Sequence, residues 1–509
     1  MNDRFKNVAE IFILTMARYP NRPALVAAGR TWSYEELGCL IAAASFRLNG
    51  IVSAFTMGNR IAIIGGNHLA YITAYWSAQF IGCSTVEIDR NESLQTLLDV
   101  LRSTRPQFVV TDRDDLKSEI QGKIPVESFE EFLALAEYNN VDKTQTYKES
   151  SYNWLFEQPF TRRFRKSENI VYTSGTTASA KGIILSHGNF CYIANTVAGY
   201  LELNETDRCA LILPLCHTYG KSVLLGAVAA GAAVVILEGF GNQQRFLTRL
   251  VTEGCTVLGA VPYHLHTLVK SGCLPRYDLS SLRIITSSAD KLSPFVIDCL
   301  MEALPKVRVF SMYGLTEATT RVCYLPPEMI HVKKESCGCP LPGVELKIVM
   351  ADGRTAATGE TGEVLLRGPN VMTGYLDDPD LTAATIVDGW LKTGDLGHLD
   401  TEGFLYIDGR KKDFIKCTGE RISPLEIEKI LMEYPGVEEA AVVGRSDSLM
   451  GEIIHAHVGS RDSSLKEADL REHCRAKLSH NKVPYRYTIV KCLPRTNTGK
   501  VKKHALGKY

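Results

Sequence analysis

Up to about residue 343, short apolar runs alternate with longer segments whose apolar residues recur at helical spacing. The apolar runs, which are rich in β-branched residues, lie at 61–65, 108–111, 232–237, 256–259, 283–286 and 307–310. Segments such as 69–80 and 244–253 have the helical spacing. Continuous apolar strands separated by helices are typical of parallel sheets covered on both faces. The pattern therefore predicts an α/β fold in which a large N-terminal domain contains stacked sheets.

The pattern changes after residue 343. Segments with alternating apolar and polar residues, separated by turn sequences, lie at 345–349, 362–367 and 404–407 and predict a small antiparallel β region. A polar, charged break at 408–413 precedes a second α/β pattern, with a helix that begins at Ser423 and Pro424, a strand at 440–444 and a helix at 465–478. We therefore expect an N-terminal core (1–409) and a small α+β C-terminal domain (410–509).

Composition narrows the class of protein. A chain of 509 residues with 45% hydrophobic and 22% charged residues is an ordinary soluble protein, too long for one compact core. A net charge of zero gives no reason to expect nucleic acid or an anionic membrane as the main partner. The run 223–237 falls short of the roughly 20 residues that span a bilayer, and residues 1–20 predict an amphipathic helix, not a signal peptide.

The fourteen cysteines are scattered along the chain. Cys337 and Cys339 form a CxC pair without a second cluster, which is weak support for a zinc site. We expect reduced thiols and a cytoplasmic protein.

The stretch 172–182 (YTSGTTASAKG) is the strongest sign of chemistry. Small residues let backbone N–H groups approach an anion, hydroxyls add hydrogen bonds, and Lys181 adds a positive charge. The stretch predicts a phosphate-binding loop. It is not a Walker loop, because Ala180 precedes the lysine and Gly182 follows it. The alternative, a surface loop rich in Gly, Ser and Thr, is weakened by the motifs that follow.

Tyr313–Glu317 (YGLTE) follows the predicted strand at 307–310, and open α/β sheets place ligands at the carboxyl ends of their strands. Tyr313 could stack on a base, Thr316 could donate to a phosphate, and Glu317 could hold Mg²⁺.

Three further groups suit a nucleotide. In the TGD sequence at 393–395, Asp395 could accept both hydroxyls of a ribose, and Arg410 could join it there. The sequence 495–500 (RTNTGK) ends in Gly499, which gives the backbone freedom, and Lys500, which brings a long, mobile cation.

The motifs at 172–182, 313–317, 393–395, 409–424 (GRKKDFIKCTGERISP) and 494–500 (PRTNTGK) occur in one order along essentially the whole chain. In this order the chain resembles the adenylate-forming superfamily, which includes acyl- and aryl-CoA synthetases, nonribosomal-peptide adenylation domains and beetle luciferases. The resemblance implies a two-step reaction. A carboxylate attacks the α-phosphorus of ATP·Mg²⁺ and releases pyrophosphate to give an acyl-adenylate, and a thiol then displaces AMP to give a thioester.

The resemblance also implies roles for individual residues. The group that would hold the β- and γ-phosphates is Thr173, Ser174, Gly175, Thr176, Thr177 and Lys181. Adenine would lie against Tyr313 and the backbone of Ser288, Ala289 and Asp290. Thr316 and Glu317 would bind the α-phosphate and Mg²⁺, and Asp395 and Arg410 would bind the ribose.

Lys500 would bridge the carboxylate and the α-phosphate as an electrostatic stabiliser during adenylation. Its alternative is a solvated lysine of the tail. The family rotates its small domain between the two steps, and the pivot corresponds to Lys412 in a hinge near 410–413. The loop 416–421 would then replace Lys500, with Gly419 and Glu420 beside the incoming thiol. An ordinary strand-to-helix loop is the alternative there.

The resemblance places the acid in a pocket formed by His217, Tyr219, Gly259, Ala260, Met312 and Gly314. His217 would line or gate this pocket, although buried histidines more often only satisfy local hydrogen bonds. Met312 stands where related synthetases for extended acids often have glycine, which favours an aryl or short- to medium-chain acid. No acidic residue lies at 217–219 to hold an α-ammonium group, which argues against an ordinary α-amino acid.

The leading hypothesis is an AMP-forming ligase that uses ATP, Mg²⁺ and CoA on a small carboxylic acid. A free-standing enzyme that loads the phosphopantetheine of a carrier protein, and an amide-forming synthetase, share every motif. A non-catalytic nucleotide-binding scaffold is a further alternative, but Glu317, Asp395 and Lys500 are all present. The sequence indicates neither the acid nor the oligomeric state.

Overall fold

The computed structural model describes residues 5–52, 59–141, 167–173, 181–237, 239–417, 420–447, 451–495 and 501–508. The chain divides into two compact units. Unit 1 consists of residues 1–334, 340–344 and 368–386, and unit 2 of residues 335–339, 345–367 and 387–509. The fold is mixed α/β, with a large N-terminal part and a smaller C-terminal part, as the sequence predicts.

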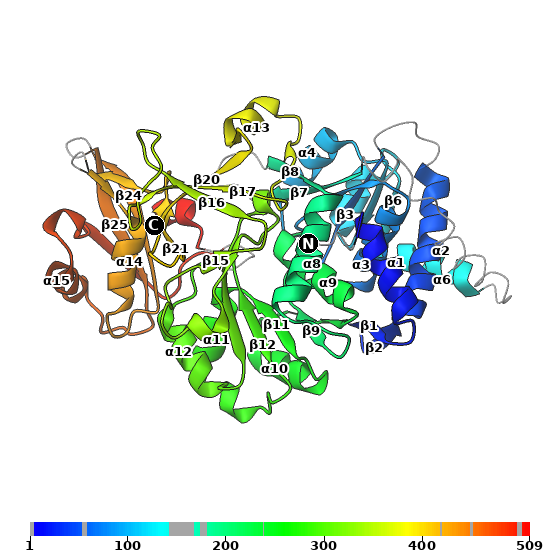
Figure 1. Ribbon diagram of the computed structural model, residues 1–509, viewed down its shortest axis with the longest axis horizontal. Helices are drawn as coiled ribbons and strands as arrows, with labels where there is room; N and C mark the ends of the chain where they lie inside the picture. The colour runs from blue at the N-terminus through cyan, green and yellow to red at the C-terminus, as the bar shows by residue number, and fades with distance from the viewer. Residues whose placement is uncertain are drawn as a thin grey trace. The chain divides into compact units, whose positions relative to one another are not determined.

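Unit 1 contains two sheets (Figure 1). The first has the order β14-β13-β12-β11-β9-β10-β1-β2, with β1 (Pro23–Ala27), β2 (Arg30–Ser33), β9 (Arg208–Leu211), β10 (Ala233–Ile236), β11 (Val257–Ala260), β12 (Ile284–Ser287), β13 (Arg308–Tyr313) and β14 (Cys323–Tyr324). The second has the order β18-β8-β7-β4-β3-β5-β6, with β3 (Arg60–Ile64), β4 (Ser84–Ile88), β5 (Phe108–Thr111), β6 (Val126–Ser128), β7 (Glu168–Thr173), β8 (Lys181–Ser186) and β18 (Gly374–Tyr375). The central strands of both sheets are parallel, and each apolar run predicted as a strand is one.

The helices of unit 1 are α1 (Val8–Arg18), α2 (Tyr34–Val52), α3 (Leu69–Phe80), α4 (Leu94–Thr104), α5 (Asp114–Ile120), α6 (Phe129–Val141), α8 (His187–Tyr200), α9 (Thr218–Ala230), α10 (Gln243–Thr252), α11 (Pro262–Lys270), α12 (Pro294–Ala303) and α13 (Pro379–Thr385). Helix α8 packs on β8 of the second sheet, and α9 packs on β9 and β10 of the first. Because α8 and α9 also pack on each other, they form a layer between the sheets (Figure 1).

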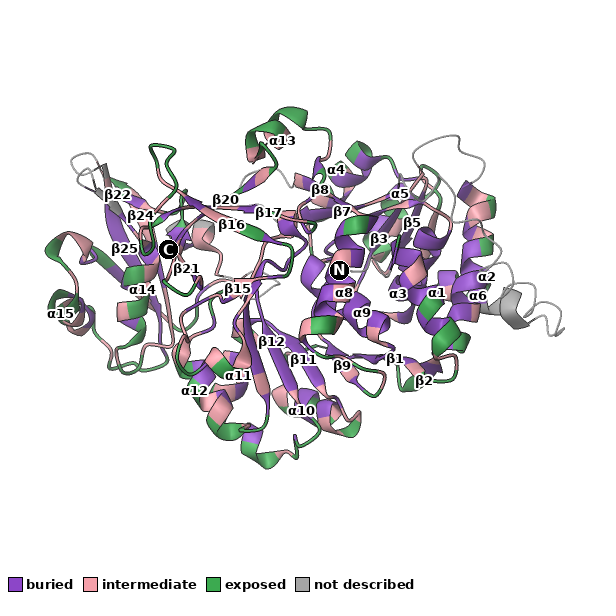
Figure 2. Ribbon diagram, in the orientation of Figure 1, coloured by how far each residue is buried: buried purple, intermediate pink, exposed green. Residues whose placement is uncertain are grey.

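Helix α9 is buried along its length, which Figure 2 shows as an almost continuous purple ribbon. It ends at Gly231, whose φ of +78° is the left-handed conformation that glycine adopts without strain. Strand β10 follows directly. The apolar run at 223–237 is thus a buried helix that leads into a buried strand. Among the described residues, no helix has both the length and the apolar composition needed to cross a membrane.

Unit 2 contains an antiparallel sheet of β16 (Glu345–Val349), β17 (Gly362–Arg367), β20 (Trp390–Leu399) and β21 (Leu405–Arg410). Its second sheet is built from β22 (Ile415–Cys417), β23 (Glu420–Ile422), β24 (Glu439–Asp447), β25 (Gly451–Gly459) and β26 (Arg486–Val490), with helices α14 (Pro424–Met432) and α15 (Glu467–Lys477). Ser423 is the N-cap of α14 and Pro424 its first residue, which confirms the predicted helix start. Apolar side chains from both helices and from the second sheet form one core.

Candidate active site

Three neighbouring parallel strands carry many of the candidate residues at their carboxyl ends. Gly259 and Ala260 end β11, the segment 288–290 follows β12 directly, and Tyr313 ends β13. Residue 289 is an alanine with φ of +80°, a strained conformation for a residue with a side chain and one that is frequent at functional sites. The structure therefore brings the residues predicted to contact adenine next to two residues of the predicted acid pocket.

Gly314 begins the loop that carries Thr316 and Glu317. A Cβ atom at this position would lie 1.5 Å from the carbonyl oxygen of Thr320, which is backbone and cannot yield. The loop is therefore folded tightly back on itself and requires glycine here. This tight turn fixes where the Thr316 hydroxyl and the Glu317 carboxylate emerge from the end of β13.

Glu317 is held by a residue that the sequence did not point to. The hydroxyl of Tyr375, from β18, donates to Glu317 Oε1 at 3.2 Å, and Met372 N donates to the Glu317 carbonyl oxygen at 2.8 Å. Burial, together with the negative charge of Glu317, raises the pKa of Tyr375. The phenol therefore stays protonated at neutral pH and can act as a donor to the carboxylate.

The group around Glu317 has the chemistry that Mg²⁺ requires. Thr316 and Glu317 are half-buried and offer a hydroxyl and a carboxylate, the hard oxygen ligands that Mg²⁺ prefers. Lys181 begins β8 opposite Thr173, which ends β7, and its ammonium group lies 5.5 Å from the centre of the Tyr375 ring. Tyr375 thus lies between the candidate metal ligand and the candidate phosphate lysine.

The structure describes only part of the predicted phosphate loop. Ser174, Gly175, Thr176 and Thr177 lie outside the described residues, and the side chain of Thr173 is not described either.

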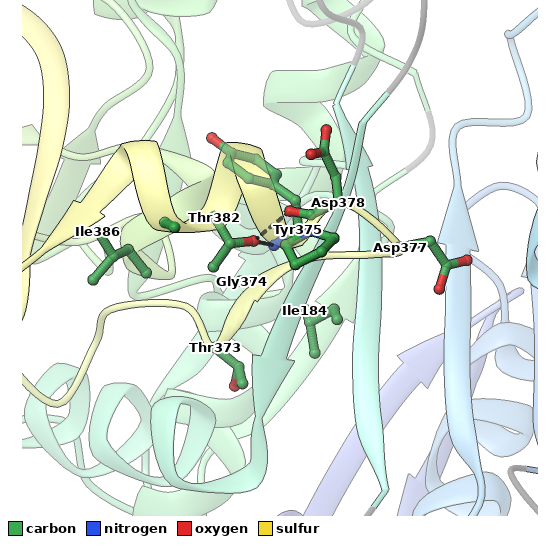
Figure 3. A pocket seen from close by; sticks show the side chains of 10 residues that line it. Ile184, Thr373, Gly374, Tyr375, Asp377, Asp378, Thr382 and Ile386 are labelled. Atoms are coloured by element: carbon green, nitrogen blue, oxygen red, sulfur yellow. Dashed lines mark hydrogen bonds between the residues drawn. The ribbon is translucent and has the colours of Figure 1, made fainter.

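A pocket of about 510 Å³ lies beside Tyr375 (Figure 3). It is formed mainly by β18 and by α13 with its flanking residues, and Ile184 of β8 contributes to its wall. The backbone N–H of Tyr375 donates to the Thr382 hydroxyl at 2.9 Å, which fixes β18 against α13. This pocket is separate from the residues predicted to bind the acid.

His217 and Tyr219, both residues of the predicted acid pocket, lie at the start of helix α9. The Tyr219 hydroxyl lies 2.9 Å from Thr286 Oγ1 of β12, and burial raises its pKa to about 12. His217 is the N-cap of α9, and its Nε2 lies 3.5 Å from Oδ2 of Asp89, a residue at the end of β4 that sequence reasoning missed. A carboxylate oxygen of Asp89, the sulfur of Cys216 and a ring nitrogen of His217 all lie within 4.8 Å of one another.

Met312 is buried in β13, and its sulfur accepts a hydrogen bond from Arg321 Nη1 at 2.9 Å. Arg321 is a third residue that sequence reasoning missed. The sequence could have pointed to Arg321 in one way. The residue lies four positions after Glu317 and is the single charged residue in the run RVCYL.

In unit 2, the predicted ribose residues form a pair. Asp395 lies opposite Arg410 across β20 and β21, and Arg410 Nε donates to Asp395 Oδ1 at 3.0 Å. Lys412 is exposed in the turn after β21. Glu420 is the first residue of β23, but its side chain is not described, and Gly419 and Lys500 lie outside the described residues.

Residues 13–376 match the family described as AMP-binding enzyme, and residues 426–500 match the AMP-binding enzyme C-terminal domain. The chain belongs to this family. It is therefore a member of the adenylate-forming superfamily and an AMP-forming acid–thiol ligase of the acyl-CoA synthetase type.

Individual relatives are similar over most of the chain. The 2-succinylbenzoate–CoA ligase of Geobacillus sp. (strain WCH70) is 31% identical over 451 residues, 88% of this chain and 87% of the relative. The indoleacetate–CoA ligase of Aromatoleum aromaticum is 37% identical over 337 residues, 66% of this chain and 65% of the relative. The structure of o-succinylbenzoate CoA synthetase from Bacillus subtilis, in complex with an acyl-adenylate intermediate, has a TM-score of 0.84 at 28% identity and covers 98% of this chain and 97% of that one.

Proposed function

We propose that this ligase activates an aryl or short- to medium-chain carboxylic acid with ATP·Mg²⁺ and transfers the acyl group to CoA. The main support is the convergence of Gly259, Ala260 and Tyr313 with the segment 288–290 at the carboxyl ends of β11, β12 and β13. The named relatives, CoA ligases for 2-succinylbenzoate and indoleacetate, support an aryl acid and CoA as acceptor.

In the first step two anions must meet, because a carboxylate attacks a phosphate. Lys181 neutralises phosphate charge, and Thr316 donates to the α-phosphate. Glu317, held by the Tyr375 hydroxyl, would ligate Mg²⁺, which when bound supplies further positive charge to the phosphates. Lys500 stabilises the charge that develops between carboxylate and α-phosphate. The residues of unit 1 thus bind the reactants and orient them, while Asp395 and Arg410 take the ribose.

In the second step the segment 410–509 acts as a lid that turns about Lys412. The loop 416–421, with Gly419 and Glu420, then takes the place of Lys500 beside the thiol. Two variants separate the steps. Lys500→Ala should lower adenylation by about 10²–10³-fold while thiolysis of preformed acyl-adenylate is retained. Lys412→Pro should retain adenylation and slow thioester formation; equal loss of both half-reactions in either variant would contradict these roles.

The test of the proposed function is acid-dependent exchange of labelled pyrophosphate into ATP, measured with aryl, short-, medium- and long-chain acids and with amino acids. We expect exchange with aryl or short- to medium-chain acids. A second assay then offers CoA, a holo-carrier protein or an amine as acceptor and follows AMP release. Release with CoA alone is expected, whereas release only with a carrier protein or an amine would favour the alternative acceptors.

A further inference from the structure

Arg321 is a buried cation beside the predicted acid pocket. Its side chain is among the largest in unit 1 that are fully buried, with only 1% of the residue exposed. Its guanidinium carbon lies 5.2 Å from the centre of the Tyr219 ring, and its Nη1 donates to the sulfur of Met312. Two residues assigned to the acid pocket on other grounds therefore contact this guanidinium.

Among the described residues, the hydrogen-bond partners of Arg321 are all neutral. Nε donates to Ser222 Oγ at 3.0 Å, and Nη1 donates to the Tyr200 hydroxyl as well as to Met312. Burial raises the pKa of both Tyr200 and Tyr219, so neither phenol supplies a negative charge at neutral pH. Within the described part of the chain, no carboxylate forms an ion pair with Arg321, and its Nη2 has no hydrogen-bond partner.

Such an arrangement is costly in a folded protein. An arginine side chain stays charged, and burying a charge without a counter-charge destabilises the folded state even after relaxation. Another buried cation of unit 1, Lys221, avoids this cost because Glu87 lies 2.6 Å away. The chain is also strained where it positions Arg321, since the two preceding threonines have φ of +50° and +75°.

We infer that the acid substrate carries a second anionic group, a carboxylate, which pairs with Nη2 of Arg321 while the first carboxylate is adenylated. This inference rests on the proposed function and adds a substrate class to it, namely small dicarboxylic acids. The planar guanidinium suits this role because its unused Nη2 presents two N–H groups to a carboxylate. Arg321 is therefore a specificity-determining residue.

The test is pyrophosphate exchange with matched pairs of acids that differ by one carboxylate, such as benzoate and isophthalate, phenylacetate and homophthalate, and butanoate and glutarate. For the wild type, in the pair that fits the pocket best, we expect kcat/KM to be about 10- to 100-fold higher for the dicarboxylate than for the monocarboxylate, the effect of a hydrogen bond to a charged group. Arg321→Met should abolish or reverse this preference, and Arg321→Lys should retain part of it.

Arg47→Met is the matched control. Arg47 is also largely buried, but its guanidinium already forms two hydrogen bonds with Glu127, at 2.5 and 2.8 Å. Its loss should lower stability and leave the preference for dicarboxylates unchanged. The wild-type panel keeps the inference testable even if Arg321→Met does not fold.

The outcomes are distinct. Exchange with monocarboxylates as good as with dicarboxylates in the wild type, or a preference that survives in Arg321→Met, would overturn the second-carboxylate inference and leave the proposed function intact. No exchange with any acid would overturn the proposed function, and the inference would fall with it.

Discussion

The buried ion pair between Lys221 of α9 and Glu87 of β4 offers a sharp test of the packing between α9 and the second sheet. The two charged groups lie 2.6 Å apart, with 2% and 0% of their side chains exposed. Glu87 also accepts hydrogen bonds from the Tyr71 hydroxyl and from Thr85 Oγ1, and the Lys221 ammonium lies 3.3 Å from the centre of the Tyr75 ring. The pair therefore joins the helical layer to the second sheet through a fully buried contact.

Lys221→Met removes the cation but keeps most of the apolar volume, so Glu87 is left buried without its counter-charge. Removal of one partner of a buried pair costs about 3–5 kcal/mol. With an m-value of about 3 kcal/mol per molar urea, the unfolding midpoint of unit 1 should fall by roughly 1 M or more. The measurement is urea unfolding followed by tryptophan fluorescence, because Trp76 is fully buried in α3 of the same unit.

A control variant and a double variant complete this test. Lys123→Met removes the same charge from an exposed pair with Glu119, whose side chains are 67% and 49% exposed, and should cost less than about 1 kcal/mol. Adding Glu87→Gln to Lys221→Met should recover at least half of the loss, since no buried charge then remains. The reasoning would be refuted if Lys221→Met lost no more unfolding free energy than Lys123→Met. It would also be refuted if the double variant regained none of the lost free energy.

Three further predictions follow from the structure. Gly314→Ala should abolish adenylation and lower the expressed yield, because the added Cβ would overlap the Thr320 carbonyl oxygen at 1.5 Å; full activity in pyrophosphate exchange would contradict this. Tyr375→Phe should lower kcat/KM for ATP·Mg²⁺ about tenfold and raise the Mg²⁺ requirement, because Glu317 loses a donor; an unchanged Mg²⁺ titration would count against the contact. Burial lowers the pKa of His187 to about 4, so protonation favours the unfolded chain and stability should fall as the pH drops from 6.5 towards 4, by about 1.4 kcal/mol per pH unit at most. His187→Gln should remove this part of the pH dependence of the urea midpoint, and an equal slope in both proteins would argue against it.

In the first sheet, the strands that are buried on both faces were the easiest to predict from the sequence. The runs that became β10, β11 and β12 consist of buried residues throughout, and their polar residues, Thr286 and Ser287, lie together at the end of β12. Strand β25 was missed although it is central in unit 2, because His455 and His457 interrupt its apolar pattern. Both histidines are buried, and burial lowers their pKa, that of His457 to about 4, so they pack as neutral residues.

The residues of the candidate site also fall into those that the sequence reveals and those that it does not. Residues within short motifs, such as Tyr313 and Glu317, could be named from the sequence because the chemistry is visible in neighbouring letters. Tyr375 could not, since it lies 58 residues from Glu317 and only the pairing of β18 with β8 brings it there. Arg321 was missed for another reason, because its importance arises from neutral neighbours that the fold assembles around it.

The route of the chain between the two units limits how this enzyme can be recombined with its relatives. The chain passes from one unit to the other after residues 334, 339, 344, 367 and 386. Because both units are discontinuous in sequence, any single crossover separates segments that belong to the same unit. The apolar core that runs from Ile415 to Tyr487 is instead contiguous in sequence. Exchange of the segment from residue 411 onward would transfer this core whole, so a library of chimeras should have its junction there.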